Sequence, residues 1–238
     1  MSEAPIKPQV LDDPPMPLTE HLVELRRRLI VSLLILAAGS AAVFHFSGEF
    51  LNWLARPVGS LIFVAPTEAF YTRLRLAVYG GFLLTLPLIL HQVWLFTARA
   101  IEPRWRKMFL SMLPLSYGLF LLGSALCLYL VVPTAMKFLL SYGSEGVEPM
   151  ITLGAYLDFV TGLSLSFGFV FQLPLVFYSL NRMGILQRSR LVKLRRHIYL
   201  LCFLSSAFLT PGPDVVTQLC LALPALVLFE LSLLAMKR

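Results

Sequence analysis

The residues best placed to do chemistry in this chain lie at the edges of long apolar runs. Glu20 and Glu24 come just before the first run and are followed by Arg26, Arg27 and Arg28. Carboxylates pair well with guanidinium groups, so Glu20 and Glu24 could bind a basic ligand at a membrane surface. The alternative is an interfacial helix leading into a membrane anchor, with Glu24 paired to Arg27 or Arg28 at helical spacing.

Gln172 is the polar group that lies deepest inside an apolar run. It precedes Arg182 by ten residues, which corresponds to roughly 15 Å of helix. An amide in lipid needs hydrogen-bond partners, so its side chain is expected to face protein or a cavity. The simplest expectation is a hydrogen bond to a neighbouring helix, contributing on the order of 1 kcal/mol.

Enzyme chemistry is not predicted. The four histidines show no metal-ligand spacing and do not stand beside a nucleophile, and the chain lacks a phosphate-binding glycine loop. All three cysteines lie within apolar runs, where cysteine behaves as a small hydrophobe. We therefore expect a protein that is not an enzyme and that carries neither a metal nor another cofactor.

The composition indicates which elements must position these polar groups. The 238 residues are 58% hydrophobic and only 14% charged, with a mean hydropathy of +0.78. Soluble domains are nearer one quarter charged, so a soluble globular enzyme is excluded. The net charge of +7 could suggest nucleic acid. However, the basic residues flank apolar runs, which indicates a lipid bilayer and no nucleic acid as the partner.

The apolar runs predict an all-α polytopic membrane protein with six spans, at about 28–47, 74–97, 108–133, 156–181, 197–210 and 215–235. The last two spans form a short hairpin around a Thr-Pro-Gly-Pro-Asp turn. If successive connections between the spans lie on alternate sides of the membrane, 16 of the 20 Lys and Arg residues lie on one side. The other side has Arg56, Arg73, Arg75 and Lys137. The positive-inside rule then places both termini in the cytoplasm. Residues 1–17 are expected to form a disordered, proline-rich cytoplasmic tail before the membrane domain 18–238.

Four segments in fixed order give the sequence a family resemblance. They are HLVELRRRL at 21–29, PLILHQVWLF at 87–96, FGFVFQLP at 167–174 and TPGPDVVTQ at 210–218; Leu223-Pro224 and Phe229-Glu230 fit the last helix. With these segments, the sequence resembles the TatC family over about residues 16–236. TatC is the multi-spanning subunit of the twin-arginine (Sec-independent) protein translocase.

The resemblance implies six helices in a concave, glove-like bundle within the cytoplasmic (inner) membrane. It further implies a receptor that recognises twin-arginine signal peptides of folded cargo at the cytoplasmic face. Its partners would be single-span TatA and TatB proteins, within a homo-oligomeric receptor complex, and the proton-motive force would drive export.

The resemblance also carries particular residues. Signal peptides would be bound by Glu24, Arg26, Phe96 and Glu102. A partner helix would dock at Gln172 and Tyr129. Pro57 and Asp214 would be structural or functional positions on the outer side. Two positions depart from the family pattern. Gln172 stands where a glutamate is usual in the fourth span, and Trp105 aligns with a usual loop glutamate, whose role Glu102 could take. Gln172 keeps a hydrogen-bonding group for a partner helix but loses a titratable charge.

Two alternative functions remain. A secondary transporter for a small solute should show an internal repeat and a midplane polar cluster, whereas this chain has one midplane amide. A divergent TatC-like scaffold that does not bind signal peptides would be compatible with the two missing carboxylates.

Overall fold

The structure is a computed structural model that describes residues 18–59, 61–100, 103–142, 150–210 and 215–236. Within these residues the regular secondary structure is helical, and Ile62 and Thr152 form an isolated parallel bridge. The long helices are α1 (Leu18–Phe44), α3 (Pro66–Ala100), α4 (Pro103–Leu126), α6 (Leu153–Val170) and α10 (Val215–Ala235). The shorter ones are α2 (Ser47–Ala55), η1 (Cys127–Val131), α5 (Val132–Leu140), α7 (Leu173–Arg182), α8 (Arg188–Lys193) and α9 (Arg195–Leu209).

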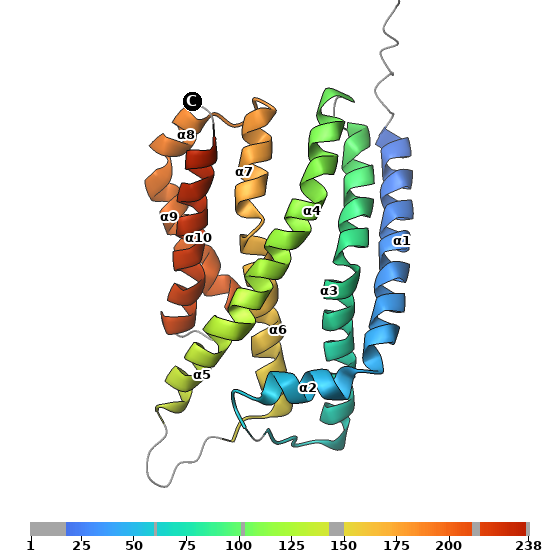
Figure 1. The fold of residues 1–238 in the computed structure, drawn as a ribbon, viewed down its shortest axis with the longest axis vertical. Helices are drawn as coiled ribbons and strands as arrows, with labels where there is room; N and C mark the ends of the chain where they lie inside the picture. The colour runs from blue at the N-terminus through green and yellow to red at the C-terminus, as the bar shows by residue number, and fades with distance from the viewer. Residues whose placement is uncertain (1–17, 60, 101–102, 143–149, 211–214, 237–238) are drawn as a thin grey trace, which may run out of the picture.

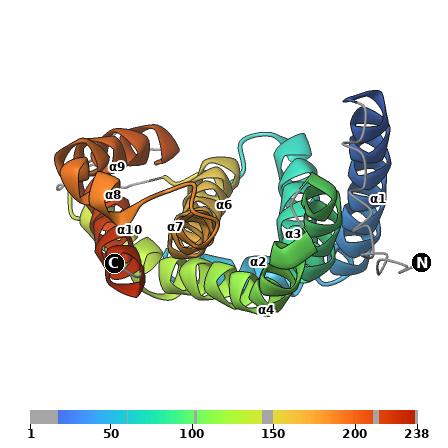
Figure 2. The same cartoon turned by 90° about the horizontal axis from the view of Figure 1, so that it is seen from above.

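The helices stand side by side as a curved wall, with α1 and α3 at one edge and α9 and α10 at the other (Figures 1 and 2). The rod formed by α4, η1 and α5 crosses the wall diagonally, from beside α3 to below α10. The helix α1 begins and α10 ends at the same end of the wall, which we call the terminal end. The opposite end carries α2, and we call it the α2 end.

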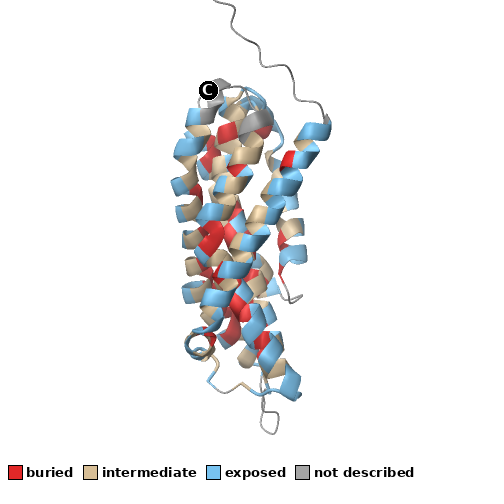
Figure 3. Ribbon diagram, turned by 90° about the vertical axis from the view of Figure 1, so that its right-hand side faces the viewer, coloured by how far each residue is buried: buried red, intermediate tan, exposed pale blue. Residues whose placement is uncertain are grey.

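Membrane-spanning character is clear for five helical segments. Each is long and apolar enough to cross a bilayer, and they cover Thr19–Phe44, Pro66–Thr97, Lys107–Leu140, Leu153–Arg182 and Val215–Ala235. With 15 residues, α9 is about 22 Å long and falls short of the roughly 30 Å hydrocarbon core. A sixth span therefore stays a prediction. The outer sides of the wall are largely exposed, as a lipid-facing surface requires (Figure 3).

The sequence predicted neither α2 nor α8, and two predicted spans have internal irregularities. The third continues from α4 through a π-helical turn, where the Val132 N–H bonds to the Cys127 carbonyl. Pro133 follows and lacks a donor, which disrupts the regular ladder. The fourth breaks at Phe171–Gln172 into α6 and α7, with Pro174 in the first turn of α7.

Close approach of α1 and α3 depends on glycine. A Cβ atom added at Gly81 of α3 would lie 2.5 Å from the backbone nitrogen of Ser40 in α1. A Cβ added at Gly39 would lie 2.3 Å from Cγ2 of Thr85. Small residues at such positions let two helix backbones pack closely in a membrane. This contact keeps α1, which is mostly exposed, beside α3.

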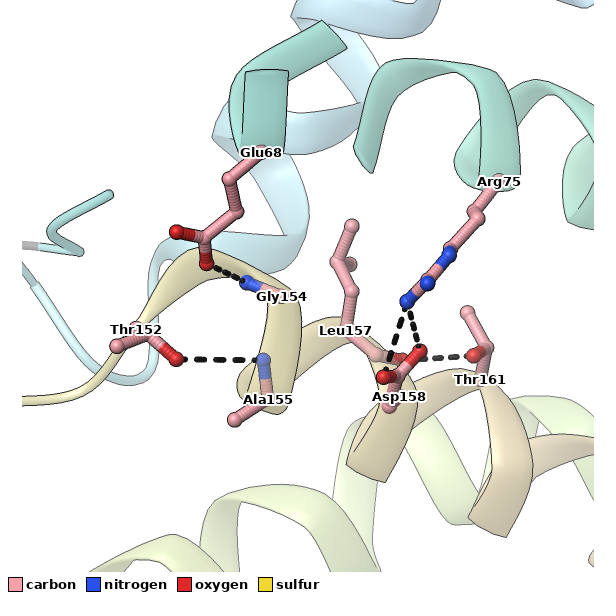
Figure 4. Close-up of polar contacts among 8 residues, drawn as sticks. All are labelled: Glu68, Arg75, Thr152, Gly154, Ala155, Leu157, Asp158 and Thr161. Atoms are coloured by element: carbon pink, nitrogen blue, oxygen red, sulfur yellow. Dashed lines mark hydrogen bonds and ion pairs between the residues drawn. The ribbon is translucent and has the colours of Figure 1, made fainter. Parts of the chain in front are cut away.

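Polar contacts hold α3 against α6 at the α2 end (Figure 4). The two carboxylate oxygens of Glu68 accept hydrogen bonds from the backbone N–H groups of Val64 (2.9 Å) and Gly154 (2.8 Å). Farther along the same helices, Arg75 Nη1 contacts both carboxylate oxygens of Asp158, at 2.8 and 3.0 Å. Deeper still, the Tyr79 and Ser164 hydroxyls lie 2.7 Å apart. The two helices are therefore joined by a row of polar contacts over several turns.

Candidate functional site

A buried carboxylate marks the terminal end of α1. Glu24 is only 6% exposed, and its Oε1 accepts a hydrogen bond from Arg28 Nε at 2.7 Å, one turn along the helix. Arg28 Nη1 in turn donates to Gln92 Oε1 of α3 at 2.9 Å. The predicted pairing of Glu24 with Arg27 or Arg28 is confirmed for Arg28. It also links α1 to α3, since the same guanidinium bonds to both helices.

Aromatic residues lie beside this carboxylate. The His21 ring of α1 stacks on the Phe96 ring of α3, with centroids 4.4 Å apart and planes inclined by 28°. His21 precedes Glu24 by nearly one helical turn, so the stacked rings and the carboxylate share one side of α1. Arg26 is exposed on the same helix. The structure therefore brings Glu24 and Phe96 to one place, and leaves Arg26 on the surface nearby.

This arrangement can bind a cation with an apolar neighbour. A buried carboxylate already holding one guanidinium has the geometry for charge-assisted hydrogen bonds. The stacked rings beside it offer an apolar face against which an aliphatic or guanidinium group could pack. Among the described residues, no group of three or more His, Cys, Asp or Glu side chains could hold a metal ion.

The second candidate feature is an apolar groove between α3, α4 and α7. Its volume is about 500 Å³, and Gln172 lines it together with Trp94, Phe109 and Val176. Ser116 Oγ of α4 donates to Gln172 Oε1 at 2.6 Å, and Gln172 Nε2 donates to the Ser116 carbonyl oxygen at 2.9 Å. Ser116 of the neighbouring helix thus bonds to both the oxygen and the nitrogen of the Gln172 amide. This is the interhelical bond that the sequence favoured.

The remaining predicted positions lie apart from these two features. Tyr129 in η1 is 71% exposed, and its ring meets Trp53 of α2 edge-on at 5.7 Å. Thirteen residues separate Tyr129 from Ser116 along one rod, roughly 20 Å, so Tyr129 does not join Gln172. Pro57 is exposed in the turn after α2. Glu102 and Asp214 lie outside the described residues, and for Trp105 only its place in the first turn of α4 is described.

Sequence reasoning missed the partners of these residues. Gln92 lies 64 residues from Arg28 and Ser116 lies 56 residues from Gln172. His21 and Gln92 both fall within the family-like segments, which could have indicated them. Ser116 stands in an apolar run with an ordinary helical pattern, so no local signal indicated its role.

Comparison with known proteins identifies the family. The family profile described as Sec-independent protein translocase protein (TatC) matches residues 20–224. The TatC of Carboxydothermus hydrogenoformans is 40% identical over 231 residues, covering 95% of each chain. TatCd of Bacillus subtilis is 36% identical, covering 89% of this chain and 88% of its own.

A solved structure shares the fold as well. A crystal structure of the twin-arginine translocase receptor TatC in the detergent DDM superposes with a TM-score of 0.80 at 33% identity, covering 92% of this chain and all of that one. The profile match, the identities and the shared wall of helices all agree. The chain therefore belongs to the TatC family and is a multi-pass subunit of the Sec-independent protein translocase in the cytoplasmic membrane.

Proposed function

We propose that this chain is the receptor subunit that binds twin-arginine signal peptides of folded cargo, at the terminal end of the wall. The observation that carries the proposal is Glu24, a buried carboxylate that already holds a guanidinium beside the stacked His21 and Phe96 rings. The crystal structure of a twin-arginine translocase receptor has the same fold. Membership in the family favours this function over transport of a small solute.

Recognition would proceed by exchange of arginines at the carboxylate. A peptide guanidinium would share Glu24 with Arg28 or displace it, and Arg28 would keep its bond to Gln92. Glu102, which precedes α4 in the sequence, would supply the acceptor for the second arginine. Each guanidinium can form two parallel hydrogen bonds to one carboxylate, whereas a lysine ammonium cannot, so a peptide with two lysines should bind less well.

We further propose that the terminal end faces the cytoplasm. The four basic residues assigned to the opposite face lie at or near the α2 end, on α3, on α5 and after α2. The other sixteen would then face the cytoplasm, as the positive-inside rule requires.

The groove along Gln172 would receive the helix of a single-span TatA- or TatB-type partner, within a complex that holds more than one copy of this chain. The groove is apolar and opens between α3 and α7, which suits a partner helix. Gln172 would supply hydrogen bonds to that helix but no proton. In a system driven by the proton-motive force, proton transfer would therefore fall to other groups.

The test compares two glutamates on the same helix. Glu24→Gln removes the buried charge but keeps an acceptor for Arg28, whereas Glu20→Gln removes an exposed charge one turn earlier. Loss of a charge-assisted bond costs about 1.5–3 kcal/mol, so Glu24→Gln should weaken twin-arginine peptide binding roughly 10- to 150-fold. Glu20→Gln should change it less than about threefold. Fluorescence anisotropy of a labelled peptide with the detergent-solubilised protein would measure both.

A peptide with both arginines replaced by lysine provides the second arm. This peptide should bind the parent protein weakly, and Glu20→Gln should not raise its affinity. Equal affinity for the two peptides, or equal effects of the two substitutions, would contradict the receptor function. The divergent scaffold without signal-peptide binding would then be the better account.

A further inference from the structure

A basic cavity lies at the terminal end on the far side of the wall from Glu24. It has a volume of about 770 Å³ and is formed where the chain turns from α7 through α8. Its lining residues are Asn181, Arg182, Gln187, Arg188, Ser189 and Lys193, with Val192. Three of these are cations and three are neutral hydrogen-bonding groups. No carboxylate is among the described residues that line it.

The cavity is built by packed and bonded groups. Asn181 Nδ2 donates to the Leu186 carbonyl at 3.0 Å and closes the turn after α7. Leu191 of α8 is buried against Phe229 and Leu233 of α10. Arg188 Nε donates to the Leu233 carbonyl at 2.9 Å, which fixes the direction of its guanidinium. Arg188 is therefore held at the cavity by the fold, while Arg182 Nε donates to the Tyr178 hydroxyl of its own helix at 3.0 Å.

The surrounding charge is strongly unbalanced. Residues 182–196 contain six Lys and Arg residues and no Asp or Glu. The carboxylate on the facing part of α10, Glu230, is already bound by Arg195 at 2.9 Å and by the Tyr199 hydroxyl. It is thus directed to α9 and leaves the charge of the cavity uncompensated. A cationic signal peptide would be repelled here, and an anion would be attracted.

The position along the membrane normal identifies the kind of anion. Ile185, Val192 and Leu194 are exposed beside the cations, and Leu200, Leu201 and Leu204 continue as an exposed apolar face down α9. Cations bordering an exposed apolar face belong at the boundary between headgroups and acyl chains. A phosphodiester at this level would meet the cations, while its acyl chains would lie along α9.

We propose that this cavity binds the phosphate headgroup of an anionic phospholipid. Arg182 and Lys193, both exposed at its rim, would contact the phosphate, and Arg188 would line the base. The lipid would fill the surface between α7 and α9, next to the short hairpin. This inference is independent of signal-peptide binding at Glu24.

The test uses two double variants with the same loss of charge. Arg182→Gln with Lys193→Gln removes two cations of the cavity and leaves the Arg188 bond intact. Arg190→Gln with Arg196→Gln removes two exposed cations, one on α8 and one on α9, that do not line the cavity. Full-length protein in detergent would be offered phosphatidylglycerol and phosphatidylcholine with identical acyl chains. Native mass spectrometry would report the ratio in which the two lipids remain bound.

The parent should retain phosphatidylglycerol preferentially. Each cation near an anionic headgroup raises the affinity for that lipid roughly fivefold. The preference for phosphatidylglycerol should therefore fall at least tenfold in the cavity variant and less than about threefold in the control variant. If the double variant does not fold, Lys193→Gln alone should lose about fivefold. Equal losses in the two double variants, or no preference in the parent, would overturn the proposal. Displacement of the lipid by excess inorganic phosphate at constant ionic strength would instead indicate a soluble phosphate as the ligand, and would equally overturn it.

Discussion

Replacement of Gln172 by leucine separates two roles for the amide in the groove. Gln172 makes two hydrogen bonds to Ser116, so the protein itself supplies partners for both ends of the amide. If its role is to join α7 to α4, Gln172→Leu should destabilise the protein and leave partner association intact. If it also docks a partner helix, association should weaken as well.

The magnitude follows from the two hydrogen bonds that the substitution removes. Polar pairs within membranes contribute about 0.6 kcal/mol each on average and about 1.7 kcal/mol at most. The Ser116 hydroxyl, in a residue that is 8% exposed, can turn to a carbonyl of its own helix when Gln172 is gone, which limits the penalty. We therefore expect a loss of about 1 kcal/mol, which corresponds to a fall in Tm of roughly 2–4 °C for a chain of this size.

The assay combines thermal melting in detergent with co-purification of the single-span partner. Gln172→Glu keeps an acceptor for the Ser116 hydroxyl and, as the neutral acid, a donor for the Ser116 carbonyl, so in that form it should melt within about 2 °C of the parent. Ser116→Ala completes a double-mutant cycle, in which the second substitution should cost less once the first has been made.

Two results would refute the role of Gln172 in joining the helices, and a third would refute its role in docking a partner. Fully additive effects of Gln172→Leu and Ser116→Ala would show that the two side chains do not interact. An unchanged Tm together with strong loss of the partner would show that the amide serves docking alone, and intact co-purification would remove the docking role.

Three other parts of the fold offer tests of their own. Gly81→Ala should lower Tm by several degrees, because its Cβ would meet the backbone of Ser40, whereas Gly118→Ala, whose Cβ would meet nothing within 4 Å, should leave Tm unchanged or raise it slightly. Glu68→Gln should lower the midpoint of chemical denaturation, since it weakens two charge-assisted bonds to backbone N–H groups. A cysteine introduced within 143–148 should react with a membrane-impermeant maleimide added from outside intact cells; labelling from the cytoplasm alone would overturn the proposed orientation.

The helices themselves could largely be predicted from the sequence, and their interruptions could not. Long uncharged runs determine where a chain can cross lipid, because each backbone group must bond within its own helix. Prolines do not by themselves determine breaks. Pro87 and Pro114 lie inside unbroken α3 and α4, whereas Pro174 lies just after the break that separates α6 from α7. The helices α2 and α8 are too short, at nine and six residues, to show a decisive periodicity.

The candidate site, too, could be predicted from the sequence only in part. Helical spacing offered Arg27 and Arg28 as partners of Glu24, because residues three or four apart are neighbours on a helix, and the structure pairs it with Arg28. The contact between His21 and Phe96 joins residues 75 positions apart, and periodicity carries no information about which helices become neighbours. The resemblance to a family indicated both residues as members of separate segments, and the fold then placed them together.

The polar contacts explain how a thin wall keeps its shape without a thick core. Arg28 joins α1 to α3 at the terminal end, the pair of Ser116 and Gln172 joins α4 to α7 near mid-depth, and Arg75 joins α3 to α6 toward the α2 end. Each contact bridges helices that meet along one side only, since in a wall a helix touches few neighbours. Apolar packing holds such a wall together but leaves its curvature loosely fixed, because apolar contacts have little directionality. Hydrogen bonds at three depths supply that direction and so orient neighbouring helices along the wall.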